Sequence, residues 1–218
     1  MRRVLLGSFS VLVLIGNLYS ADVERPFRSM KSADLLVKSR QHSVKAIREL
    51  GMRKDKSAIG VLKNLASEPD VEIQISTGYI RSTERREIRK KEMRRSSRME
   101  ARIALARIGE TGYLEEFIIG LSSSNLNWKS ECIRRLAEIG DKRAVAHLIP
   151  ILDDDSAPPS EAFGHDKMVF SFQAALGLKV LLPDVHAGFV VKHNGRGKLF
   201  RDDWKNWWSL NKDKFQIK

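Results

Sequence analysis

The chain has 218 residues, enough for one domain with a hydrophobic core or for a short array of repeats. Its composition, 42% hydrophobic and 30% charged, is not that of an intrinsically disordered protein. The formal net charge of +12 favours anionic partners, namely nucleic acid, acidic lipid or glycan, or an acidic protein surface, and does not choose among them.

Residues 1–21 predict a signal peptide. Arg2 and Arg3 precede an uncharged run, residues 4–15, which is too short to span a bilayer comfortably but matches the apolar region of a signal peptide. Cleavage after Ala21 would place Tyr19 at the −3 position, where a small residue is preferred, so the cleavage position stays open. An uncleaved anchor or a core helix is the alternative. We expect an exported bacterial protein, periplasmic or secreted, without a transmembrane span after signal removal.

The stretch IRRLAEIGDKRAVAHLIPILDDD, residues 133–155, predicts two amphipathic helices that fold back on each other at Gly140 and Asp141. Apolar residues recur at helical spacing in both halves. Gly140 can adopt the left-handed conformation that ends the first helix, and Asp141 can cap the second. Pro150 lies inside the second helix, so it should bend that helix or relax its last turns.

This helical hairpin is repeated along the chain. Residues 101–121 carry the same pattern, and an earlier copy in residues 43–70 aligns Gly51 with Gly140 and has a longer turn. A partial copy in residues 172–184 keeps the pattern of the first helix, but its second helix is not recognisable. Two short helices cannot bury both apolar stripes alone. Stacked hairpins share one continuous core, so the repeats predict a solenoid that presents the face formed by its second helices.

The segment AEIGDKRAVAHLIPIL resembles the HEAT-repeat family, in particular the short bacterial type called PBS-lyase-like HEAT repeats. The resemblance extends from about residue 43 to residue 183 and is most specific in residues 128–152. It implies an all-α fold, an α-solenoid of three to four HEAT-like helical hairpins over residues 22–183. It also implies a protein-binding scaffold. A minority of the family have enzymatic relatives, such as bilin lyases or a DNA glycosylase, but no position here carries those activities over.

The repeats are interrupted by an insertion at about residues 71–98. Between Arg81 and Arg102 the sequence holds ten Lys or Arg and four Glu, a net charge of +6. Because residues 84–108 contain no Gly or Pro, they predict one extended helix whose first half has few apolar residues and should project from the solenoid. Upstream, VEIQI alternates at period two, which fits either a short strand or the start of a helix.

We interpret the inserted basic helix as a docking surface for an acidic protein partner. A solvated helix face, held by pairs such as Glu87 with Lys91, is the alternative. Nucleic acid, as in DNA-glycosylase-like relatives, or anionic lipid or polysaccharide of the envelope also suits the charge, although aromatic residues for stacking are absent apart from Tyr79. The predicted binding residues are Arg85, Arg86, Arg89, Lys90, Arg94 and Arg95.

Residues 184–218 are expected to close the C-terminal end of the array. Residues 189–191 and 199–200 flank a Gly-rich turn and favour a small β-hairpin, with a plain loop as the alternative. Three tryptophans share one side of a following helix, and we interpret them as a cap over the core rather than as a sugar or peptide site. This segment resembles the tryptophan-rich C-terminal segment after HEAT arrays in some secreted bacterial proteins. The tryptophans are Trp204, Trp207 and Trp208.

The sequence offers no catalytic motif, so we expect a protein that is not an enzyme and has no cofactor. The five histidines form no HExxH or HxH pair, and their separations match no known set of metal ligands. The acidic run at 153–155 suggests calcium only by composition, and a loop that ends a helix is the favoured interpretation. Cys132, the single cysteine, lies among apolar residues at helical spacing and predicts a buried structural thiol.

Overall fold

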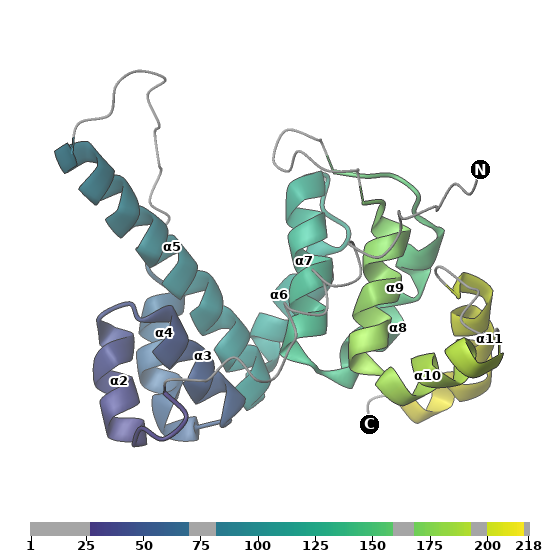
Figure 1. Ribbon diagram of the computed structural model, residues 1–218, viewed down its shortest axis with the longest axis horizontal. Coiled ribbons are helices and arrows are strands. Elements are labelled where there is room, and N and C mark those ends of the chain that lie inside the picture. Colours follow the sequence, from purple (N-terminus) through teal and green to yellow (C-terminus); the bar gives the residue numbers. More distant parts are fainter. Residues whose placement is uncertain (1–26, 70–81, 159–167, 193–199, 216–218) are drawn as a thin grey trace, which may run out of the picture.

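The computed structural model describes residues 27–69, 82–158, 168–192 and 200–215. Within these ranges the regular secondary structure is entirely helical, and Figure 1 shows the helices packed side by side in a row that follows the chain. The α-helices are α2 (Ser32–Arg40), α3 (Val44–Met52), α4 (Ile59–Ala66), α5 (Ser82–Ile108), α6 (Thr111–Gly120), α7 (Leu126–Ile139), α8 (Val145–Leu148), α9 (Phe170–Leu181), α10 (Pro183–Lys192) and α11 (Arg201–Asn211). The predicted signal peptide, the VEIQI segment and the Gly-rich turn lie outside the described residues.

The fold is the predicted all-α solenoid of helical hairpins. Four hairpins follow one another, formed by α3 with α4, α5 with α6, α7 with α8, and α9 with α10. The first helices of consecutive hairpins contact each other, α3 against α5, α5 against α7, and α7 against α9. Helix α2 precedes the array and α11 follows it (Figure 1). The second helix of the last hairpin, which the sequence pattern did not reveal, is α10.

Helix α5 joins the two halves of the core. On one side Ala101, Ala104 and Leu105 are buried against α2, α3 and α4, in the N-terminal part of the core. On the other side Ile103 and Ala106 are buried with residues of α6 to α9 in the C-terminal part. The apolar stripes of neighbouring hairpins are therefore kept out of water by stacking, as the repeat pattern predicts.

The turns of the hairpins follow the predicted chemistry in the third repeat and depart from it in the first. Gly140 has the left-handed φ of 79°, and the carboxylate of Asp141 accepts a hydrogen bond from the backbone N–H of Arg143. Gly51, which aligns with Gly140, lies inside α3 instead. A β-carbon on Gly51 would lie 2.7 Å from the α-carbon of Ala104, so this glycine permits the close approach of α3 and α5.

Two short 3₁₀ segments replace part of the second helix in the third repeat. η2 (Lys142–Ala144) begins after Asp141. η3 (Pro150–Asp153) begins two residues after the end of α8. Pro150 has no backbone N–H to donate to the preceding turn, so it interrupts the α-helical ladder there. The predicted disturbance at Pro150 is confirmed. Similar 3₁₀ segments begin α4, as η1 (Lys56–Ala58), and follow α11, as η5 (Lys212–Phe215).

The predicted β-strand at residues 189–191 is wrong, because these residues belong to α10. Within α10, Val185 and Phe189 lie four residues apart on one side of the helix, and both pack against the C-terminal part of the core. The ring of Phe189 meets Trp204 edge-on, with centroids 4.9 Å apart. This apolar run is therefore part of a helix that packs against α11.

Candidate docking surface

Helix α5 confirms the predicted extended helix and projects from the solenoid. It has 27 residues, so its length is about 40 Å at a rise of 1.5 Å per residue. Its first buried residue is Ser97, and the preceding residues, 82–96, reach beyond α2, α3 and α4 in Figure 1. We call residues 82–96 the projecting half and residues 97–108 the packed half of α5.

The base of the projecting half is anchored by two loops of the N-terminal hairpins. Ser97 donates a hydrogen bond to the carbonyl of Arg94, and its Oγ lies 2.9 Å from Nδ1 of His42, in the loop between α2 and α3. Arg98 donates from Nη1 to the carbonyl of Glu68, after α4, over 3.2 Å. These contacts fix the direction in which α5 leaves the solenoid.

All six predicted binding residues lie on the projecting half and are exposed. Successive residues of an α-helix are about 100° apart, and on this spacing five of the six fall within an arc of about 180°. The three glutamates of the projecting half, together with Arg95, fall on the remaining half of the circumference. We call the glutamate-free arc the basic face. Its cations are Arg85, Arg86, Arg89, Lys90 and Arg94.

The basic face also carries one exposed apolar residue. Met93 lies between Arg89 and Arg86 in projection and is 44% exposed. The same arc, followed down the helix, contains Ala104, which contacts Gly51 of α3. The basic face is therefore the side of α5 that overhangs the N-terminal hairpin.

Part of the charge on the projecting half is paired along the helix, and part faces outward. Nζ of Lys90 lies 2.8 Å from Oε1 of Glu87, and this hydrogen bond and charge lower the pKa of the Glu87 carboxyl. The charge of Lys91, the expected partner of Glu87, also lowers the pKa of that carboxyl. Arg86 and Arg89 make no ion pair with any residue that the structure describes. These two arginines of the basic face are thus available to an anionic partner.

The acidic run at 153–155, considered above as a calcium site, forms ion pairs within the protein. Each carboxylate of the acidic run meets a cation: Asp153 pairs with Lys205, Asp154 with Lys129, and Asp155 with Arg201. In the described part of the chain, no three His, Cys, Asp or Glu side chains gather as they would around a metal ion. Residues 153–155 therefore connect α11 to the third hairpin and join the two ends of that hairpin through Lys129 of α7.

The tryptophans and the cysteine are part of the core. Trp204 is fully buried in the C-terminal part of the core, and Trp207 and Trp208 are partly buried against it. Cys132 is buried as predicted, and burial raises the pKa of its thiol to about 12. Since the thiolate is the reactive form, this cysteine is unsuited to act as a nucleophile.

Comparison with known proteins supports the repeat family over one part of the chain. Residues 128–154, which comprise most of α7 and the whole of α8 with its 3₁₀ segments, match the family model described as PBS lyase HEAT-like repeat. No curated protein matches the sequence. Among the helices of the described ranges, none has both the length and the apolar character that a membrane span requires.

Proposed function

We propose that this α-solenoid, whose third hairpin matches a HEAT-like repeat, is an exported, non-catalytic scaffold that holds an acidic protein partner on the basic face of α5. The repeat supports a role in protein interaction, and the projecting half of α5 supplies the recognition chemistry. Export rests on the signal-like residues 1–21. Arg2 and Arg3 are the charged side chains in this segment, so its removal lowers the net charge by two and the chain stays basic.

One observation carries the proposal, namely an exposed arc of cations without a glutamate on a helix that stands clear of the solenoid. Residues four apart on this face, such as Arg85 and Arg89 or Arg86 and Lys90, are separated by about 6 Å along the axis. Acidic residues four apart on a partner helix repeat at the same distance. Guanidinium groups also accept carboxylates in bidentate geometry, so arginine is well suited to hold such a partner.

Met93 favours a protein partner over nucleic acid or lipid. Methionine at the centre of a charged surface provides an adaptable apolar contact of the kind found in protein interfaces. Single-stranded nucleic acid is usually held by aromatic stacking, and α5 contains no aromatic residue. A helix that lies on a membrane needs a continuous apolar face, whereas the projecting half offers only Met93 and Ile88.

The test uses two variants of the mature chain that carry the same change of net charge. In the first, Arg86→Glu and Arg89→Glu reverse the basic face. In the matched control, Lys91→Glu and Arg95→Glu reverse the opposite side of the same helix. Proteins captured from cell envelopes by the unaltered chain are identified and purified, and their affinities for each variant are measured. Cell fractionation of the unaltered full-length chain tests export in parallel.

We expect the captured partner to be acidic and its affinity to fall at least about 30-fold, or about 2 kcal/mol, with the basic-face variant. The control variant should change it less than about threefold. Equal losses with both variants would show non-specific attraction and overturn the proposal. So would tight binding of duplex DNA or anionic vesicles that depends on Arg86 and Arg89, in the absence of any protein partner. Cytosolic location of the chain would overturn the export part alone.

A further inference from the structure

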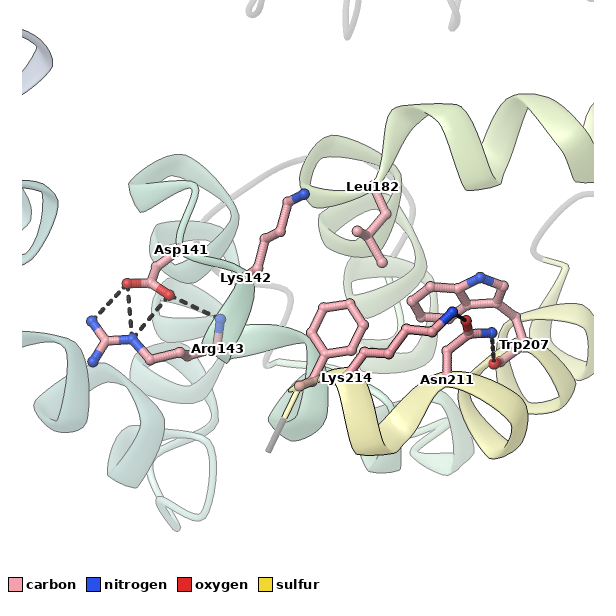
Figure 2. A pocket seen from close by; sticks show the side chains of 8 residues that line it. Asp141, Lys142, Arg143, Leu182, Trp207, Asn211 and Lys214 are labelled. Carbon is pink, nitrogen blue, oxygen red and sulfur yellow. Dashed lines mark hydrogen bonds and ion pairs between the residues drawn. The ribbon is translucent and has the colours of Figure 1, made fainter. Parts of the chain in front are cut away.

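A second candidate surface lies in the C-terminal half of the chain, away from α5. A groove of about 570 Å³ opens between η2, in the turn of the third hairpin, and η5 at the C-terminal end (Figure 2). This volume falls within the range of about 300–1,000 Å³ that ligand sites occupy. The groove is lined by Asp141, Lys142, Arg143, Leu182, Trp207, Asn211, Lys214 and Phe215.

The floor of the groove is apolar and held in place. Trp207 and Phe215 meet edge-on, with ring centroids 5.6 Å apart, and Trp207 also meets the buried Trp204 at 6.2 Å. The side-chain amide of Asn211 donates to the carbonyl of Trp207 over 2.8 Å. Leu182 completes the floor. An incoming apolar side chain would therefore meet a preformed aromatic surface, which lowers the entropic cost of binding.

The rim of the groove is positively charged. Arg143 is neutralised by Asp141, with Nη2 and Oδ2 2.7 Å apart. Lys142 and Lys214 are exposed and form no ion pair with the residues that the structure describes. Nζ of Lys214 donates to Oδ1 of Asn211 over 2.8 Å, which directs this ammonium group along the groove (Figure 2). Two available cations thus lie beside an aromatic floor.

We propose that this groove binds an acidic peptide segment of a partner protein. An aromatic or large aliphatic side chain packs against Trp207 and Phe215, and carboxylates on either side of it pair with Lys142 and Lys214. Desolvated aromatic contacts supply the affinity. The two lysines at the rim attract the peptide during association and favour one with negative charge. The proposal does not depend on α5, so either surface can fail without the other.

The test measures binding of a fluorescein-labelled peptide, Asp-Glu-Phe-Leu-Glu-Asp, to the full mature chain. Two comparison peptides separate the contributions: one replaces Phe and Leu with Ser, and the other replaces every Asp and Glu with Asn or Gln. The protein variants are the single changes Lys142→Glu and Lys214→Glu, their combination, and the control Lys212→Glu, which has the charge change of each single variant at an exposed lysine of η5 that does not line the groove. Phe215→Ala tests the floor, and thermal denaturation of this variant checks that the fold is retained.

We expect the acidic–apolar peptide to shift the indole N–H resonance of Trp207 and to bind more tightly than both comparison peptides. The double lysine variant should weaken binding at least about tenfold and Phe215→Ala by a similar factor. Lys212→Glu and the basic-face variant of α5 should change binding less than about twofold. Equal loss with Lys212→Glu, equal binding of the Ser-containing peptide, or absence of binding at millimolar peptide would overturn the proposal. Tighter binding of a DNA duplex through Lys142 and Lys214 would replace the peptide with nucleic acid.

Discussion

The two halves of helix α5 have similar arginine-rich sequences but use their arginines differently. In the packed half, Arg98, Arg102 and Arg107 donate to backbone carbonyls of neighbouring hairpins, those of Glu68, Ala66 and Glu138, and Arg102 also pairs with Glu116 of α6. In the projecting half, Arg86 and Arg89 are exposed and form no ion pair with the residues that the structure describes. An arginine thus stabilises the fold where another repeat faces it, and remains available for a partner where none does.

The packed half contains a charge network that crosses three repeats. Arg48 of α3 binds Glu100 of α5 with two hydrogen bonds, of 3.0 and 2.8 Å. Arg107, whose side chain is only 8% exposed, lies 3.8 Å from Glu100 and 3.7 Å from Glu138 of α7. Burial lowers the pKa of Arg107, and the two carboxylates oppose that change. Because both signs of charge are buried together, the loss of one member leaves its neighbours buried without that partner of opposite charge.

The largest difference in stability between the two halves of α5 is expected from Glu100→Ala in the packed half. Glu100 is 3% exposed, and its removal leaves Arg107 buried with one carboxylate in place of two and Arg48 without its bidentate partner. The free energy of unfolding, measured with urea, should fall by about 3 kcal/mol. The matched change Glu92→Ala, on the exposed projecting half, should leave it unchanged within error. Equal effects of the two variants would show that the halves do not differ in this way.

A smaller effect is expected where two helices touch through a glycine. A β-carbon on Gly120 of α6 would lie 2.2 Å from Sγ of Cys132 and 2.9 Å from Nε1 of Trp128, both on α7. Gly120→Ala should therefore lower the free energy of unfolding by about 2 kcal/mol. Gly60→Ala, where nothing lies within 4 Å, should raise it by about 0.5–1 kcal/mol, because alanine favours the helix. Thermal denaturation of both variants distinguishes the packed glycine from the open one. A higher melting temperature for Gly120→Ala would contradict the close approach of α6 to Cys132 and Trp128.

The smallest effect on stability is expected from the basic face itself. Arg86, Arg89 and Arg94 are exposed and form no ion pair with another element of the described residues, so replacing them together with Ala keeps those contacts intact and leaves helix propensity high. The urea midpoint should stay within error of the unaltered chain, while the affinity for an acidic partner falls. A large loss of stability would show that these arginines support the fold and would weaken the case for a docking surface.

Local features were predictable because they depend on residues close in sequence. Gly140 and Asp141 form the expected turn, Pro150 interrupts its helix as expected, and α5 extends as its composition predicts. The exposure of the six basic residues followed from the lack of apolar residues around them. For the candidate site, the sequence therefore supplied the residues and their helical spacing, but not the contacts of Ser97 and Arg98 that fix the direction of α5.

Other features depend on residues far apart and could not be predicted from local pattern. The run Phe189–Val190–Val191 has the aromatic and β-branched composition of a strand, yet it belongs to α10, where Phe189 meets Trp204 of α11. The first hairpin turns at Lys54, which adopts a φ of 53°, because Gly51 is used for helix contact. The groove between Lys142 and Lys214 combines two segments that no sequence motif connects.

The sequence by itself determined the helices, their turns and the recurrence of apolar stripes, since hydrogen bonding and periodicity act within a few residues. The tertiary structure decided which charges are satisfied. Whether an arginine meets two carboxylates, as Arg107 does, or stays exposed, as Arg89 does, depends on where the neighbouring hairpins end. Burial and pairing of a charge are set by residues from other repeats, and those neighbours exist only after the hairpins have stacked.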